Sequence, residues 1–106
     1  MKYEGLLPIG SVVNLQNVEN QPVMIMGYCV RKANQPARLF DYCGCPHPSG
    51  ALAPDQTLLF NHAQIQKVLS VGYISETSYV FIPKMEQILA ELRQKNVKKE
   101  GEPNET

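Results

Sequence analysis

The spacing of apolar residues changes once along this 106-residue chain, near Ser75. Before that point, short apolar stretches are separated by turn residues, a pattern that is typical of strands. After it, apolar residues recur at three- and four-residue spacings, as on one face of an amphipathic helix. They are Tyr79, Ile82, Met85, Ile88, Leu89 and Leu92. The pattern therefore predicts a sheet followed by a C-terminal helix.

Five segments of the first part are predicted to be extended. They are Ser11–Val18, Val23–Val30, Leu39–Cys43, Thr57–Phe60 and Val68–Val71. The first two flank the polar turn Glu19–Pro22 and should form a hairpin, whereas the polar stretch Arg31–Pro36 interrupts the pattern. Prolines between Pro46 and Pro54 predict an irregular loop. We expect an α+β fold with a small, mainly antiparallel sheet of about five strands, curved or barrel-like.

A short helix is predicted between the last two extended segments. Asn61 is a favourable N-cap, and the side chain of Gln64 can return a hydrogen bond to the backbone of the cap. Phe60 and Ile65 occupy the two positions of a hydrophobic staple around this helix start.

Pro83 limits where the C-terminal helix can be predicted to begin. Inside a helix a proline costs about 3 kcal/mol, whereas in the first turn it costs almost nothing. The helix is therefore expected from Pro83 onward, and Tyr79–Ile82 is either a preceding helical turn or an extended lead-in. Its apolar stripe either covers the sheet or binds a partner, so the predicted partner-binding residues are Met85, Ile88, Leu89 and Leu92.

Charge and composition exclude several classes of protein. Ten Lys and Arg residues balance ten Asp and Glu residues, which leaves no broad positive field for a nucleic-acid partner. No apolar run reaches the roughly 18 to 20 residues of a membrane span, and none near the N-terminus resembles a signal peptide. We expect a cytoplasmic protein without membrane insertion. Residues 1–95 should form a single domain, and the polar segment 96–106 a disordered tail.

Cys43, Cys45 and His47 place potential metal ligands at every second position. On an extended chain their side chains share one face, and Cys29 or His62 could complete a tetrahedral zinc site. Structural zinc sites use wider cysteine spacings, however, and free cysteines commonly serve as small buried apolar residues. We therefore expect no metal and no cofactor, and keep a metal-binding or thiol-dependent protein as an alternative.

No set of catalytic residues is visible in the sequence. Cysteine, His62 and Asn61 are the residue types of a thiol protease, but Asn61 already has a local role as a cap. The carboxylates of Asp41, Asp55 and Glu76 are well separated, so no two of them share an element for acid–base chemistry. We expect a protein that is not an enzyme.

Several segments resemble one protein family over roughly residues 6–92. They are Leu6–Val13, Val23–Tyr28, Asp41–Gly50, Phe60–His62, Ile65, Val68 and Gly72–Tyr73. In this order the chain resembles the domain of unknown function 4176 family. Its D-Y-x-G-C and F-N-H elements, which we interpret as structural, map to Asp41, Tyr42, Gly44, Cys45, Phe60, Asn61 and His62. Many relatives carry an aromatic residue where this chain has His47, which weakens the case for a metal site.

The resemblance implies a role in protein secretion. Members of the family are small cytosolic proteins of Gram-positive bacteria, often encoded beside type VII secretion components and LXG-domain toxins. The implied function is a non-catalytic accessory protein that binds an LXG-type toxin, or another secretion component, as a chaperone or targeting factor. A toxin immunity protein is a further alternative.

Overall fold

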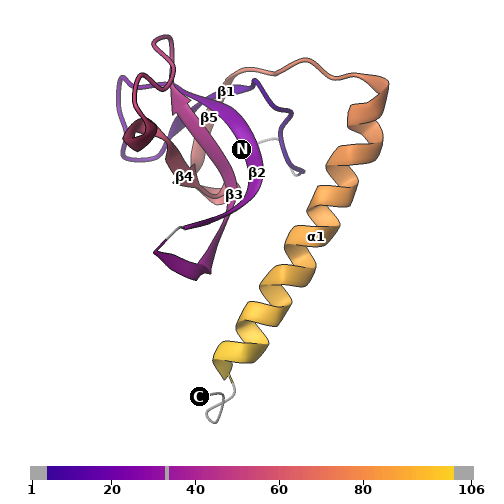
Figure 1. Cartoon of the computed structure of the whole chain (residues 1–106). Coiled ribbons are helices and arrows are strands. Elements are labelled where there is room, and N and C mark those ends of the chain that lie inside the picture. Colours follow the sequence, from indigo (N-terminus) through magenta and orange to yellow (C-terminus); the bar gives the residue numbers. More distant parts are fainter. Residues whose placement is uncertain (1–4, 33, 102–106) are drawn as a thin grey trace.

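The computed structural model describes residues 5–32 and 34–101 (Figure 1). The sheet is antiparallel, open and curved, with the strand order β4-β3-β2-β1-β5. Its strands are β1 (Val12–Leu15), β2 (Val23–Lys32), β3 (Gln35–Pro46), β4 (Leu58–Phe60) and β5 (Ile65–Ser70). Two 3₁₀ turns, η1 (Pro54–Gln56) and η2 (His62–Gln64), flank β4, and the helix α1 (Glu76–Gly101) lies along one side of the sheet. The predicted α+β class is confirmed.

The hairpin of β2 and β3 is longer than the sequence pattern predicted. Pairing continues into the polar stretch that was expected to interrupt it, and Lys32 lies opposite Gln35. A hairpin turn needs as few as two residues, and ladder hydrogen bonds are made by the backbone, so polar residues can pair beside the turn. At the other end of the hairpin, Pro46 closes β3 opposite Val23.

The core lies on the concave face of the curved sheet. Successive side chains of a strand point to opposite faces, so buried residues alternate with more exposed ones along the strands. In β1, Val13 and Leu15 are buried while the residues between and before them are half-exposed. The largest fully buried side chains, Tyr42 and Phe60, pack with ring centroids 5.3 Å apart. Phe60 and Ile65, the predicted staple, both belong to this core. The helix predicted between them is a single 3₁₀ turn, where Gln64 Oε1 accepts the backbone N–H of Asn61 at 2.8 Å, as expected.

The helix α1 begins upstream of Pro83, which lies inside it. Its start is fixed by two serines: the backbone N–H of Ser75 donates to Ser78 Oγ at 3.0 Å, and the N–H of Ser78 donates to Ser75 Oγ at 3.3 Å. This reciprocal arrangement is a capping box. Pro83 leaves the carbonyl of Tyr79 without its helical donor, but both residues are on the exposed side of the helix, where water can replace that donor.

The helix also extends further than expected at its other end. It continues to Gly101, so residues 96–101, which the sequence analysis assigned to a disordered tail, are helical. The last five residues of that predicted tail, 102–106, lie outside the described part of the chain. None of the described helices is long and apolar enough to cross a membrane.

Gly44 should tolerate no larger residue. A Cβ atom at this position would lie 2.6 Å from the carbonyl oxygen of Met24 and 2.7 Å from Cγ1 of Val23. We expect Gly44→Ala to lower the free energy of unfolding by about 2 kcal/mol, as overpacking does, in urea denaturation. The control Ala51→Gly, in an exposed loop, should change stability by less than about 0.5 kcal/mol. Equal stability of Gly44→Ala and wild type would contradict this packing.

Candidate functional site

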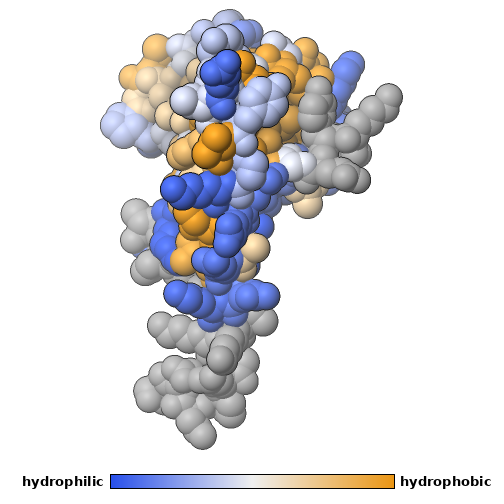
Figure 2. All heavy atoms as spheres, turned by 90° about the vertical axis from the view of Figure 1, so that its right-hand side faces the viewer, coloured by the Kyte–Doolittle hydropathy of each residue, from blue (hydrophilic) through white to orange (hydrophobic). Residues whose placement is uncertain are grey.

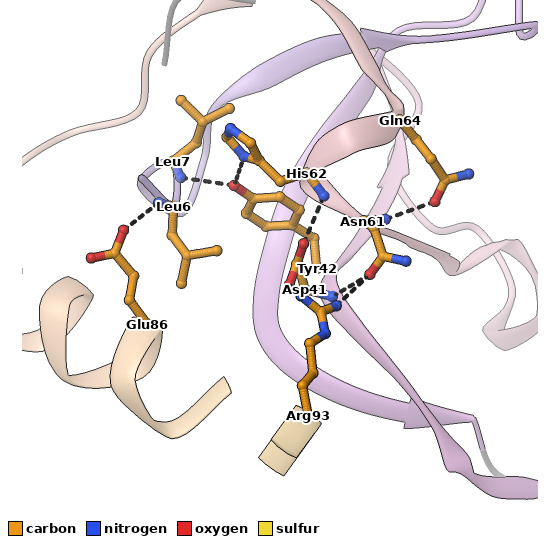
Figure 3. Close-up of polar contacts among 9 residues, drawn as sticks. All are labelled: Leu6, Leu7, Asp41, Tyr42, Asn61, His62, Gln64, Glu86 and Arg93. Atoms are coloured by element: carbon orange, nitrogen blue, oxygen red, sulfur yellow. Dashed lines mark hydrogen bonds and ion pairs between the residues drawn. The ribbon is translucent and has the colours of Figure 1, made fainter. Parts of the chain in front are cut away.

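Five side chains from three parts of the chain meet between the sheet and α1. We call them the polar cluster: Asp41 and Tyr42 from β3, Asn61 and His62 at η2, and Arg93 from α1. Figure 3 shows Tyr42 reaching the backbone of Leu7 in the N-terminal segment, while Asp41, Asn61 and Arg93 meet one another. Four of the five belong to the motif residues singled out in the sequence, and Arg93 does not.

The carboxylate of Asp41 joins the sheet to the turn and to the helix. Its Oδ1 lies 2.7 Å from Nη1 of Arg93, and its Oδ2 accepts the backbone N–H of His62 at 2.8 Å. The side chain of Asp41 is only 8% exposed, whereas that of Arg93 is 42% exposed. Burial of a carboxylate is tolerated when charged and polar donors surround it in this way.

Asn61 completes the attachment of α1. Its side-chain oxygen accepts the backbone N–H of Asp41 at 3.0 Å and Nη2 of Arg93 at 2.8 Å. Arg93 therefore donates from both of its terminal nitrogens, one to a carboxylate on β3 and one to an amide beside η2. The two bonds fix the helix against strand β3 and against the turn at η2.

Tyr42 places a phenol at the centre of the cluster. Its oxygen accepts the backbone N–H of Leu7 at 2.9 Å and lies 2.7 Å from Nδ1 of His62. Because one lone pair already accepts from Leu7, the phenolic proton can be donated to His62 when Nδ1 carries no proton. Burial raises the pKa of Tyr42 well above its ordinary value, so the phenol stays protonated at neutral pH.

The N-terminal segment is held by side chains from both layers. The hydroxyl of Tyr28 donates to the carbonyl of Leu7, and Glu86 Oε2 of α1 accepts the backbone N–H of Leu6 at 2.8 Å. Burial raises the pKa of Tyr28 to about 12. A cavity of about 400 Å³ remains beside these contacts; its lining includes Gly5, Asp41, His62, Glu86, Leu89 and Arg93. The cluster pairs its charges and keeps the phenol of Tyr42 protonated, so its chemistry favours a structural role.

The structure does not assemble Cys43, Cys45 and His47 into a metal site. Cys43 is half-buried and Cys45 is buried on β3, whereas His47 is exposed beyond the end of the strand. Among the residues that the structure describes, no group of three His, Cys, Asp or Glu side chains is placed to hold a metal ion. Burial raises the pKa of Cys43, which disfavours the thiolate that metals bind.

The predicted partner-binding stripe faces the body of the protein. Leu89 is only 4% exposed, so its assignment to an accessible surface is wrong: this side of α1 lies against the sheet and the N-terminal segment. Met85, Ile88 and Leu92 are half-buried on the same part of the helix. Packing thus uses the centre of the stripe.

Exposed apolar side chains gather instead where α1 begins. They include Tyr73 (85% exposed), Ile74 (42%), Tyr79 (73%), Val80 (73%) and Phe81 (49%). Figure 2 shows apolar surface on the upper part of this side of the molecule. This surface was not predicted from the sequence, where the structure of the residues just before Pro83 was left open. The capping serines Ser75 and Ser78 were the signal that could have revealed the earlier start.

A narrow apolar groove lies beside these residues, between α1 and the sheet. Its volume is about 250 Å³. It is lined by Pro8, Ile9, Tyr28, Tyr73, Thr77, Ser78, Phe81 and Ile82. The rings of Tyr28 and Phe81, 6.1 Å apart between centroids, link its two walls. We call these eight residues the apolar groove.

Breaking the contact between α1 and the sheet should be measurable as a coupling energy. We expect Arg93→Met to lower the free energy of unfolding by about 1–3 kcal/mol, because it leaves the buried Asp41 carboxylate without its cation. The double variant Arg93→Met with Asp41→Asn should lose about 1 kcal/mol less of the free energy of unfolding, measured by urea denaturation, than the two single variants lose in sum. Lys95→Met, in the exposed part of the same helix, is the control. Strict additivity would contradict a direct interaction.

The two buried phenols should make the protein sensitive to alkali. The pKa of Tyr28 is about 12 and that of Tyr42 is also raised, against 10.0 for the ordinary phenol. Their contribution to stability is complete below pH 10 and is lost as the pH rises through the native pKa values, because the unfolded chain releases these protons first. Above pH 10, we expect the free energy of unfolding, measured by urea denaturation, to fall less steeply with pH for Tyr42→Phe than for wild type. Parallel curves would contradict the assignment.

Comparison with known proteins agrees with the motif residues. A protein-family model described as Domain of unknown function (DUF4176) matches residues 6–81. The match includes Asp41, Tyr42, Asn61 and His62, whereas Arg93 lies beyond it. No curated protein and no solved structure matches the chain. The matched segment covers well over half of the sequence, and the chain therefore belongs to the family described as Domain of unknown function (DUF4176).

Proposed function

We propose that the protein is a non-catalytic accessory protein that binds another protein through the apolar groove at the start of α1. The observation that supports this proposal is the concentration of exposed apolar side chains there, led by Tyr73 at 85% exposure. Contiguous exposed apolar surface on a folded protein commonly marks a site of protein interaction. The motif resemblance supports an LXG-type toxin, or another type VII secretion component, as the partner.

The shape and composition of the groove suit an anchoring side chain of a partner protein. Its volume of about 250 Å³ is below that of most small-molecule pockets, which enclose roughly 300–1,000 Å³. Tyrosines such as Tyr28 and Tyr73 offer both an apolar ring and a hydroxyl, and such residues are enriched at the centres of protein interfaces. An apolar residue of the partner could insert between Ile9 and Phe81.

The contacts around the groove favour binding over catalysis. Burial raises the pKa of Tyr28 and keeps this groove residue protonated, and its hydroxyl donates to the carbonyl of Leu7. The charged side chains of the nearby polar cluster, Asp41 and Arg93, pair with each other and join α1 to the sheet. Binding an apolar segment of a toxin here before export is the action of a chaperone or targeting factor.

Substitution at the rim of the groove should weaken the complex. We expect Tyr73→Ser to reduce affinity for an LXG-type toxin at least tenfold, about 1.4 kcal/mol, measured by calorimetry with purified proteins. Leu52→Ser is the matched control, since Leu52 is an apolar residue of similar exposure, 77%, outside the groove. Unchanged affinity of Tyr73→Ser, or an equal loss in both variants, would overturn the assignment of this surface.

Export and toxicity assays separate a chaperone from an immunity protein. For a chaperone or targeting factor, Tyr73→Ser should reduce the amount of toxin secreted. Loss of protection from the toxin with unchanged secretion would instead support an immunity role, and it would contradict the proposed function in export.

A further inference from the structure

We propose that the outer side of α1 pairs with the same side of a second copy of this chain, in antiparallel orientation around Val80. We call Glu76, Thr77, Val80 and Lys84 the outer face. Thr77 belongs to both the outer face and the apolar groove. The inference does not depend on the proposed function, because its occupant is a second copy of the chain and it is tested at Val80 and at the two charges, none of which lines the groove.

The outer face is an apolar surface between two charges. Val80 is 73% exposed and is flanked by Tyr79 and Phe81, which are 73% and 49% exposed. A shallow hollow of about 450 Å³ lies over this side of the helix; it is lined by Glu76, Thr77, Val80, Phe81 and Lys84. The opposite side of α1 carries the buried Leu89 and contacts the body of the protein. The outer face is thus turned away from the sheet.

The spacing of the charges gives the surface its complementarity to itself. Glu76, Val80 and Lys84 follow one another at four-residue intervals, so they form one row along the helix. The two charges therefore lie about 6 Å above and below Val80 along the axis. A two-fold axis through Val80 places Glu76 of each copy opposite Lys84 of the other, twice in one interface. Such a contact is isologous and closes after two copies.

The same symmetry matches the flanking aromatic residues. One residue before and one after Val80 lie on opposite flanks of the helix, and the two-fold axis pairs like flanks, so Tyr79 of one copy lies beside Tyr79 of the other and Phe81 beside Phe81. Aromatic pairs of this kind contribute attraction beyond their buried area. The chain carries a formal net charge of zero, so two copies approach without long-range repulsion.

Among the described residues of one copy, these two charges have no ion-pair partner. Glu76 and Lys84 are eight residues apart, about 12 Å along the helix axis, which is too far for them to pair with each other. In the described part of the chain, neither residue forms an ion pair. Pairing with a second copy satisfies both charges at once, and this reciprocity favours self-association over a partner of different sequence.

Charge reversal tests the register of this dimer. Sedimentation equilibrium of the full chain at low salt should show a concentration-dependent dimer. Glu76→Lys and Lys84→Glu each bring like charges together and should raise the dimer dissociation constant at least tenfold. The double variant Glu76→Lys with Lys84→Glu recreates the opposite pairing and should return the constant to within about threefold of wild type.

The controls separate this register from general charge effects. Glu19→Lys and Lys67→Glu make the same changes at exposed positions away from α1 and should leave the dimer intact. Val80→Arg places two cations on the two-fold axis without altering the first turn of the helix, and should abolish the dimer while the helical circular dichroism remains. A wild-type monomer at all concentrations, or a double variant that stays as weak as the single ones, would overturn the proposal.

The result is also distinct from that of the groove experiment. Tyr73→Ser should leave the dimer constant within about twofold of wild type, since Tyr73 is outside the outer face. A loss of dimer in Tyr73→Ser, with Val80→Arg still dimeric, would show that the copies associate through the groove and would overturn pairing around Val80.

Discussion

The buried carboxylate of Asp41 is the group on which the arrangement of sheet, turn and helix depends. A charge with so little exposure requires donors, and the chain supplies them from two distant places: the backbone at His62 and the guanidinium of Arg93. Each donor fixes the element that carries it. The position of α1 beside the sheet is therefore determined by the solvation of one ion as well as by apolar packing at Leu89.

A second constraint is the need to satisfy the backbone hydrogen bonds of the segment before β1. In the described structure, Leu6 and Leu7 of this segment belong to no strand. Buried peptide groups need partners whether or not they belong to a ladder. Here the partners are side chains. The hydroxyl of Tyr42 accepts the N–H of Leu7, and the hydroxyl of Tyr28 donates to the carbonyl of Leu7. The carboxylate of Glu86 accepts the N–H of Leu6. These tyrosines act as structural bonds between segments, and burial keeps them in the protonated form that this role requires.

Local pattern was enough to predict the hairpin of β1 and β2, the extended residues at β4 and the bond from Asn61 to Gln64. Each depends on neighbours in sequence. The end of the β2–β3 hairpin was missed because backbone pairing does not require apolar side chains. The start of α1 upstream of Pro83 was left open, because the penalty of a proline inside a helix was weighed without the capping serines and without the water available to an exposed carbonyl.

The candidate site was predictable only in part. The motif resemblance selected Asp41, Tyr42, Asn61 and His62, but no local signal connected them to Arg93, which is distant in sequence and outside the family match. Likewise, the apolar spacing of α1 could not reveal which residues the sheet would cover. Burial of Leu89 and exposure of Val80 follow from how the helix is rotated against the sheet, and long-range polar contacts set that rotation.

The bond between Leu6 and Glu86 joins positions separated by 80 residues in the sequence. On a ribosome, the β-sheet residues emerge before the helix residues that hold the N-terminal segment in place. The N–H of Leu6 must remain hydrated until Glu86 has been synthesised and α1 can dock. The sheet can therefore form during synthesis, but the layer that contains the N-terminal segment closes only near the end of translation.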